Sequence, residues 1–187
     1  VACEFLDAEI EEGQTLVIEK YAAVISGKDS YDVKGDAEKI LRTVMETGFD
    51  AELSKHEAIY ANMWDKADLR IKGDDKLQNA VRFNIFHLMS TPNPNDNRTN
   101  VGAKLIHGEE YGGHAFWDTE LFILPFFDYV FPDVAKKLVE YRYNLLNKAR
   151  ENAKKNGYEG AKYPWESADT GDEECPSWTV EGDGSCS

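Results

Sequence analysis

The chain has 187 residues and a net charge of −14, with 42% hydrophobic and 12% aromatic residues. This composition predicts a folded protein with an apolar core and excludes an intrinsically disordered one. The negative charge argues against nucleic acids and anionic membrane surfaces as partners, because both require basic patches. The sequence also has no apolar run near the roughly 20 residues that a membrane-spanning helix needs.

The three cysteines, Cys3, Cys175 and Cys186, are widely separated in the sequence. Their odd number and their spacing predict neither a disulfide framework nor a zinc site. We therefore expect reduced thiols, which are the normal state of cysteine in a cytoplasmic protein.

Residues 1–25 are predicted to form two strands joined by a turn at Glu12 and Gly13. Residues 15–21 (TLVIEKY) are rich in side chains that favour strands. Two strands alone are marginally stable in water, and this pair would leave an apolar face uncovered. We therefore expect the hairpin to be the end of a sheet whose other strands lie upstream of Val1.

Three helices are predicted after this hairpin. Residues 28–35 form a polar linker, and Asp36 then caps a helix over residues 37–47 that Gly48 ends. A second helix is expected from Asp50 to about Leu69. The run GDD at residues 73–75 ends it and caps a third helix, whose inward positions are Leu77, Ala80, Val81, Ile85 and Leu88.

A long irregular segment, residues 90–113, precedes the densest group of functional side chains in the chain. Long ordered loops in compact domains are usually functional. Residues 121–130 are almost wholly apolar, so a buried helix is predicted over residues 116–129, with a kink at Pro125. Trp117 and Asp118 then lie at the N-terminus of this helix, where a polar first turn opens into a pocket.

The next helix is predicted from Pro132 to about Asn156, and Gly157 ends it. Residues 163–167 (YPWES) form a second loop that carries aromatic and carboxylate side chains, and residues 169–187 show no core-forming pattern. Helices joined by loops at one end predict a mainly α-helical toroid whose pocket collects those loops.

Two tryptophan–carboxylate pairs, Trp117–Asp118 and Trp165–Glu166, suit a sugar ligand. Tryptophan stacks on the apolar face of a sugar ring, and a carboxylate accepts hydrogen bonds from its hydroxyls. The alternative is that the tryptophans are core residues and the carboxylates cap helices. From the residues alone, Asp118 and Glu166 are also candidates for the acid and the base of an inverting glycosidase.

A metal site is the other chemistry that these side chains suggest, through His107, Glu109, Glu110 and His114. Their spacing differs from His-Glu-x-x-His, which puts two imidazoles on one helix face, and the glycines here indicate a loop. We therefore expect neither a metal nor a cofactor. The sequence contains no nucleophile elbow, Ser-His-Asp arrangement or phosphate-cradling Gly-Lys loop.

The run GHAFWDTE at residues 113–120, with Pro125 five residues on, resembles glycoside hydrolase family 65. The resemblance covers about residues 16–175 and extends through Gln78 and the runs GDD at 73–75, RFN at 82–84, YRY at 141–143, GYEGA at 157–161, YPWESA at 163–168 and TGDE at 170–173. That family contains the inverting phosphorylases of α-linked glucosides such as maltose, trehalose, kojibiose and nigerose.

The resemblance implies that the chain is a fragment of a larger enzyme. Residues 1–27 are then the end of an N-terminal β-sandwich domain. Residues 28–91 are linker helices and the start of the catalytic domain, and residues 92–187 are the first part of a truncated (α/α)6 barrel.

The resemblance also implies that Trp117, Asp118, Trp165 and Glu166 bind the substrate. The family's general acid is a glutamate further along the barrel, so this chain alone is expected to be inactive, and neither Glu120 nor Glu166 is assigned as the acid. The intact protein is expected to be a homodimer. It would cleave an α-glucosidic bond with inorganic phosphate as co-substrate, giving β-glucose 1-phosphate and a free sugar.

Two alternatives to a phosphorylase stay open at this point. The first is a hydrolase of the same family, which would use water in place of phosphate and would need a general base. The second is a carbohydrate-binding module without catalysis.

Overall fold

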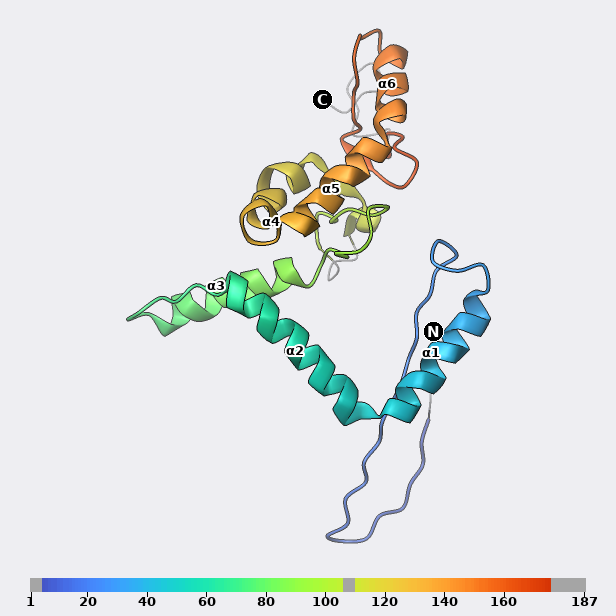
Figure 1. Cartoon of the computed structure of the whole chain (residues 1–187), viewed down its shortest axis with the longest axis vertical. Helices are drawn as coiled ribbons and strands as arrows, with labels where there is room; N and C mark the ends of the chain where they lie inside the picture. The colour runs from blue at the N-terminus through green and yellow to red at the C-terminus, as the bar shows by residue number, and fades with distance from the viewer. Residues whose placement is uncertain (1–4, 106–109, 176–187) are drawn as a thin grey trace. The chain divides into compact units, whose positions relative to one another are not determined.

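The computed structural model describes residues 5–105 and 110–175, and the chain divides into two compact units, Val1–Asn62 and Met63–Ser187 (Figure 1). The six α-helices of the described residues are α1 (Val33–Thr47), α2 (Phe49–Ala67), α3 (Asp75–Met89), α4 (Leu124–Val130), α5 (Pro132–Asn144) and α6 (Leu146–Lys155). Two short strands, β1 (Ala115–Phe116) and β2 (Glu166–Ser167), a 3₁₀ turn at Glu110–Gly113 and a π-helical turn at Thr119–Ile123 complete the regular structure of these residues. This confirms the prediction of a mainly α-helical fold.

The described helices are each too short or too polar to cross a bilayer.

The predicted N-terminal hairpin differs from what the structure contains. A turn forms at Glu12 and Gly13, but the extended segments on either side of it, within residues 5–25, are not paired as strands (Figure 1). Their apolar side chains, including Phe5 and Val17, are exposed. A β-rich composition gives a strand only when ladder partners and a covered apolar face are present.

The first helix, α1, begins one turn earlier than predicted, because Asp32 rather than Asp36 is its N-cap. The Asp32 carboxylate accepts a hydrogen bond from the backbone N–H of Gly35 at 3.0 Å, which satisfies one of the free donors of the first turn. Gly48 ends the helix, as predicted, with a backbone φ of 83°.

The connection between α2 and α3 is fixed by two long polar side chains of α3. Gln78 accepts from the N–H of Ile71 at 2.7 Å and donates to the carbonyl of Leu69 at 2.8 Å. Arg82 donates two hydrogen bonds to the Asp68 carboxylate, and this guanidinium lowers the pKa of that carboxyl below its ordinary value. Asp74 caps α3, as the GDD run predicted.

The core of the second unit is formed where α4 packs against α5. Phe127 of α4 is 1% exposed and lies against Ala135 and Leu138 of α5, and Val101 enters the same cluster from the loop before β1. Partly buried apolar side chains surround this cluster; among them are Leu88, Leu105, Ile123, Leu124, Phe126, Phe131 and Val134. The long loop before the motif is therefore anchored in the core at Val101.

The predicted buried helix over residues 116–129 is only partly correct. Residues 115–116 are a strand, and the helical part begins with the π-helical turn, in which the N–H of Leu124 donates to the carbonyl of Thr119. Pro125, which has no N–H to give Leu121 an α-helical hydrogen bond, lies in the first turn of α4, directly after this change of register. Leu121 and Phe122 are 66% and 75% exposed, so the expectation that the whole apolar run is buried is wrong for the described residues.

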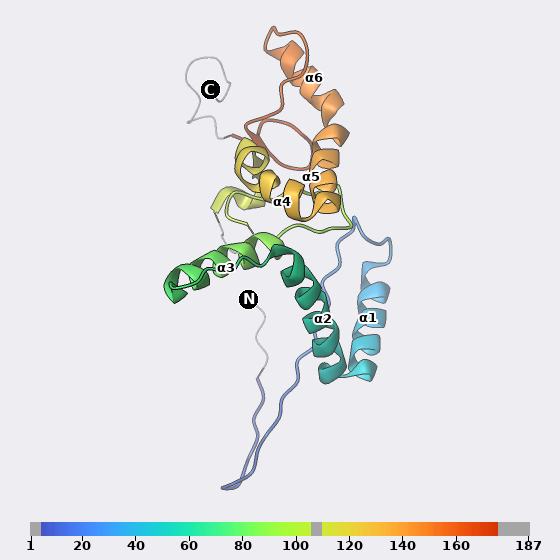
Figure 2. The same cartoon turned by 60° about the vertical axis from the view of Figure 1, so that its left-hand side comes forward.

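The helix predicted from Pro132 to Asn156 is divided into α5 and α6 at Leu145, where φ is −94° and ψ is 6°. The N–H of Leu145 bonds to the carbonyl of Arg142, three residues back, instead of continuing the α-helical pattern. The apolar stripe continues across this break, so periodicity could not reveal it. The segment after α6 runs back along that helix (Figures 1 and 2).

We expect the 187-residue chain on its own to aggregate or to bind the dye ANS. Its helices expose large apolar side chains, including Ile40, Met45, Phe49, Ile59, Leu121, Phe122 and Tyr129. Sedimentation velocity, dye fluorescence and a thermal melt measure this directly. A cooperative melt with sharp NMR dispersion and no dye binding would contradict the expectation.

Candidate functional site

The two tryptophan–carboxylate motifs are brought together by the pairing of β1 with β2. The strands are antiparallel, with Ala115 opposite Ser167 and Phe116 opposite Glu166. This register places the rings of Trp117 and Trp165 edge to face, with centroids 5.4 Å apart. Two predicted site segments that lie far apart in the sequence therefore form one surface.

Trp117 is 41% exposed, whereas Trp165 is half-buried and also packs edge to face against Phe116 at 5.9 Å. Trp165 therefore supports Trp117 from the side, and part of the Trp117 side chain remains accessible to a ligand. An indole ring held in this way offers an apolar platform of fixed orientation.

The two predicted site carboxylates have different surroundings. Asp118 is the N-cap residue of the π-helical turn, but its side chain makes no capping hydrogen bond. Glu166 is 8% exposed, and one of its oxygens lies 2.7 Å from Nδ1 of His114. The structure thus places Asp118 as a half-buried carboxylate at the motif, and Glu166 as a buried carboxylate beside an imidazole.

Glu120 is joined to α5 by a two-pronged contact with Arg142. The Arg142 guanidinium donates from Nε to one oxygen of Glu120 at 2.8 Å and from Nη2 to the other at 3.0 Å. Nη2 also donates to the backbone carbonyl of Phe116 at 3.2 Å. Asn100 donates a further hydrogen bond to Glu120 at 3.0 Å, so the end of the run at residues 113–120 is held from two sides.

The loop that carries Trp165 is held by the carboxylate of Glu173. Its two oxygens accept from the backbone N–H groups of Trp165 at 2.8 Å and of Glu166 at 3.0 Å. On the other side of the strand, the Tyr141 hydroxyl lies 3.1 Å from the Ser167 hydroxyl and donates to the carbonyl of Ala168 at 2.8 Å. Charge-assisted bonds of this kind are stronger than neutral ones, so Glu173 fixes the backbone of β2.

The same segment is held against α6 by polar contacts. Asn152 donates to the carbonyl of Gly171 at 3.0 Å, and the Lys148 ammonium lies 2.8 Å from the Asp172 carboxylate. The Lys148 charge lowers the pKa of the Asp172 carboxyl below its ordinary value of 3.8. Gly171 has a φ of 76°, and a Cβ atom there would lie 3.2 Å from the Leu145 side chain, so the close approach requires glycine.

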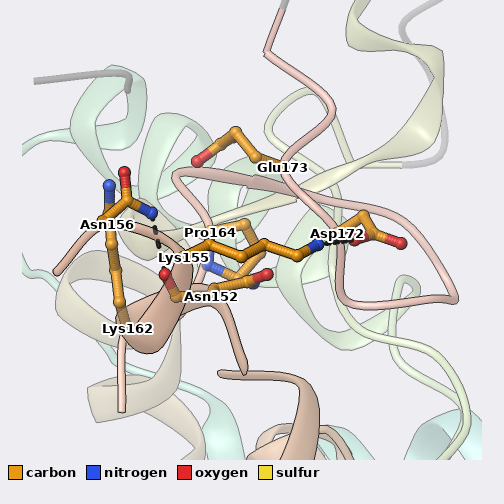
Figure 3. Close-up of a pocket in the computed structure, with 7 residues that line it drawn as sticks. All are labelled: Asn152, Lys155, Asn156, Lys162, Pro164, Asp172 and Glu173. Carbon is orange, nitrogen blue, oxygen red and sulfur yellow. Dashed lines mark hydrogen bonds and ion pairs between the residues drawn. The ribbon is translucent and has the colours of Figure 1, made fainter. Parts of the chain in front are cut away.

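Two cavities lie next to these loops. The larger, of about 840 Å³, is lined by residues that include Trp117, Glu120, Arg142, Tyr158 and Tyr163, but not by Asp118, Trp165 or Glu166. The smaller, of about 440 Å³, is lined by Asn152, Lys155, Asn156, Lys162, Pro164, Asp172 and Glu173 (Figure 3). Of the four predicted site residues, the structure therefore places Trp117 directly at the wall of a cavity.

The remaining predictions on metal ligands and cysteines concern residues that the structure covers only in part. His107 and Glu109 lie outside the described residues, and the described residues contain no group of three or more His, Cys, Asp or Glu that could hold a metal. Cys175 is disulfide-bonded, so the expectation of reduced thiols is wrong for this residue. An odd, widely spaced set of cysteines still allows two of them to meet, and sequence spacing alone does not detect this.

A comparison with known protein families identifies the family to which the chain belongs. Residues 82–184 match the family described as "Glycosyl hydrolase family 65 central catalytic domain". The chain belongs to glycoside hydrolase family 65. The runs that first suggested this family, in residues 113–120 and 163–173, are the ones that the structure brings together through β1 and β2.

The chain is also similar in sequence to proteins that are named as disaccharide phosphorylases. The chain is 50% identical over 179 residues to a kojibiose phosphorylase of Caldanaerobacter subterraneus subsp. tengcongensis, covering 95% of this chain and 23% of that protein. It is 39% identical over 166 residues to a maltose phosphorylase of Bacillus subtilis, covering 87% of this chain and 22% of that protein. The chain therefore spans less than a quarter of the length of these family 65 relatives.

A solved structure confirms the fold class. The chain matches a protein named "Putative kojibiose phosphorylase from human microbiome" with a TM-score of 0.73 and 32% sequence identity, over 80% of this chain and 21% of that one. The expectation of a mainly α-helical part of an (α/α)6 barrel is thus confirmed at the level of the fold.

Sequence reasoning missed the residues that hold the family 65 motifs in place. Arg142, Glu173 and Asn100 make the contacts described above, yet none of them was predicted to take part in the site. A signal existed for Arg142, because it follows Leu138 by four residues and so lies on the buried face of α5. A charged side chain on a buried face predicts a partner of opposite charge.

Replacing Glu173 by Gln should destabilise the full-length protein by about 1.5–3 kcal/mol, the range for a hydrogen bond to a charged group. The amide has one acceptor oxygen, and its NH₂ group would face a backbone N–H. A matched control is Glu174→Gln, because Glu174 is the exposed neighbour. Differential scanning fluorimetry measures both, and equal melting temperatures for the two variants would contradict the role of Glu173.

Proposed function

We propose that this chain is part of an inverting disaccharide phosphorylase that cleaves an α-glucosidic bond with inorganic phosphate. The family assignment and the relatives that are named phosphorylases support this proposal. The products would be β-glucose 1-phosphate and a free sugar. Phosphate is then a co-substrate, and no other cofactor is required.

The observation that carries the proposal is the joining of the two motifs across β1 and β2. It gives one surface with an accessible indole, Trp117, a supporting indole, Trp165, and two carboxylates, Asp118 and Glu166. In the proposed role, Trp117 stacks on the glucosyl ring, and Asp118 accepts hydrogen bonds from its hydroxyls. Glu166 contributes the oxygen that His114 leaves free.

The mechanism follows from the charge of the attacking group. Phosphate is already an anion, so it can attack the anomeric carbon without the general base that an inverting hydrolase needs. A glutamate outside this chain would protonate the leaving oxygen. Contacts of Trp117 and Asp118 raise the rate only if they strengthen as the ring flattens toward an oxocarbenium ion.

Kojibiose is the disaccharide that we propose as substrate of the intact protein. Three relatives named kojibiose phosphorylase are 50%, 48% and 45% identical to this chain. The relatives named trehalose, nigerose and maltose phosphorylase are 39%, 35% and 39% identical. A kojibiose phosphorylase of Escherichia coli is 34% identical to this chain.

The proposed whole enzyme also gives roles to the parts of this chain. We propose that residues 1–27 end a β-sandwich domain, that residues 28–91 link it to the barrel, and that residues 92–187 begin the barrel. The intact enzyme is proposed to be a cytoplasmic homodimer. Size-exclusion chromatography with light scattering measures the oligomeric state.

The decisive experiment is an assay of the full-length protein with kojibiose, nigerose, maltose and trehalose, each with and without phosphate. We expect cleavage of kojibiose that depends on phosphate, and NMR should show glucose 1-phosphate as the β anomer. Equal glucose release without phosphate would indicate a hydrolase. Sugar binding by calorimetry without any cleavage would indicate a binding module, and either result would overturn the proposal.

The variant Asp118→Asn tests the proposed contact with the glucosyl unit. Asn caps helices as well as Asp, and the Asp118 side chain makes no capping bond, so the melting temperature should stay unchanged. Loss of a charged acceptor is worth roughly 1.5–3 kcal/mol, so kcat/KM should fall about ten- to a hundredfold.

If this contact strengthens in the transition state, kcat should fall together with kcat/KM in steady-state phosphorolysis. Asp128→Asn, at an exposed position of α4, is the control and should leave both values unchanged. An unaltered kcat/KM in Asp118→Asn would remove Asp118 from the site.

A further inference from the structure

Both ends of the short segment 116–120 are bound by one side chain of the second unit. At its start, the backbone carbonyl of Phe116 accepts from Nη2 of Arg142 at 3.2 Å. At its end, the Glu120 carboxylate accepts from Nε and Nη2 of the same guanidinium at 2.8 and 3.0 Å. One side chain of α5 therefore binds both ends of the segment that carries Trp117 and Asp118.

The loop before β1 holds the same segment from a second direction. Thr119 is buried, with 1% of its surface exposed, and its hydroxyl donates to the carbonyl of Val101 at 2.7 Å. Asn100 donates to Glu120 at 3.0 Å. Since Val101 belongs to the core cluster with Phe127, this second anchor is fixed to the body of the unit.

Three carboxylates of the two joined motifs are already engaged. Glu120 is paired with Arg142, Glu166 lies 2.7 Å from His114, and Glu173 accepts from two backbone N–H groups. Asp118 differs from them, because among the described residues its side chain has no hydrogen-bond or ion-pair partner. It is the acceptor that the segment presents, and it lies between the two points that Arg142 holds.

We propose that Arg142 is a positioning residue that sets the location of Asp118 and Trp117 through Glu120 and the Phe116 carbonyl. This inference rests on the proposed function, because it concerns the glucosyl contact of that same site. In this role Arg142 acts through Glu120 and the Phe116 backbone, although its side chain also lines the larger cavity beside Trp117. Its guanidinium fixes the backbone on both sides of the Trp117–Asp118 pair, so that the sugar meets them in one geometry.

The shape of the guanidinium is essential to this role. Arg142 uses two nitrogens, at the fixed angle of the fork, to reach both Glu120 oxygens and the Phe116 carbonyl. A lysine would keep the positive charge but has a single nitrogen, so it could not hold both ends of the segment. Arg142 is 9% exposed and its Nη1 is buried without a partner among the described residues, so little room exists for a rearranged contact.

The test is a double-mutant cycle on the full-length protein with Arg142→Lys, in the wild-type and in the Asp118→Asn background. Misplacing a binding group by about 1 Å can cost on the order of a hundredfold in rate. We expect Arg142→Lys to lower kcat/KM for phosphorolysis about ten- to a hundredfold in the wild-type background. In the Asp118→Asn background, where only the position of Trp117 is still at stake, the further loss should be at least about threefold smaller.

A merely structural role gives a different pattern. If Arg142→Lys only unfolded part of the protein, the fractional loss of rate would be equal in both backgrounds, and it would disappear after correction for the folded fraction by circular dichroism. Equal losses in the two backgrounds, or an unchanged kcat/KM in Arg142→Lys, would overturn the proposal. The control is Arg150→Lys, because Arg150 on α6 is exposed and donates only a long, 3.4 Å hydrogen bond to Asn147 among the described residues.

A second variant covers the case in which Arg142→Lys does not fold. Glu120→Gln keeps the guanidinium and the side-chain volume, and it should show the same dependence on Asp118→Asn. Wild-type phosphorolysis is measured first, since its absence would overturn the proposed function alone. The dissociation constant for glucose is then measured by calorimetry for the same set of single and double variants. Binding losses that simply add in the double variant would overturn the positioning role.

Discussion

The site depends on the antiparallel pairing of β1 with β2. Each strand has two residues, and strands this short are not stable through backbone bonds alone. Side chains supply what the ladder lacks: Arg142 binds the carbonyl of Phe116, Tyr141 binds Ser167 and Ala168, and Glu173 binds two N–H groups of the β2 loop. The surface that carries both tryptophans therefore exists because α5 and the returning loop satisfy the backbone on either side of it.

Electrostatics follows from the same arrangement. The chain has a net charge of −14, and the joined motifs bring several carboxylates close together. Three of them have a partner, which is a guanidinium for Glu120, an imidazole for Glu166 and backbone amides for Glu173. Partners of this kind offset the cost of removing a carboxylate from water. The acidic character of the chain is thus compatible with a compact site.

How much of this could be predicted from the sequence depends on the range of the contacts involved. The helices α2 and α3 were predicted closely, because Asp74 and the glycines at positions 48 and 73 act within one turn of the residues they cap. The N-terminal segment was not, because its β-rich composition says nothing about whether a partner strand is present.

The candidate site shows the same division. Trp117 and Trp165 could be named as candidates from their residue types and from the family resemblance. Their meeting across β1 and β2 could not be derived from local pattern, because it joins residues about fifty positions apart through a register that neither run encodes. The break at Leu145 and the start of α1 at Asp32 were missed because one residue decides each of them.

The π-helical turn at Thr119–Ile123 joins the motif to the core and affects how many residues separate the two. A turn closed by the bond from Leu124 to Thr119 holds one residue more than an α-helical turn. Glu120 lies within this turn and faces Arg142, and Phe127 lies after it and fills the core. The width of the turn therefore sets the spacing between the residue that binds α5 at the site and the residue that packs against α5 in the core.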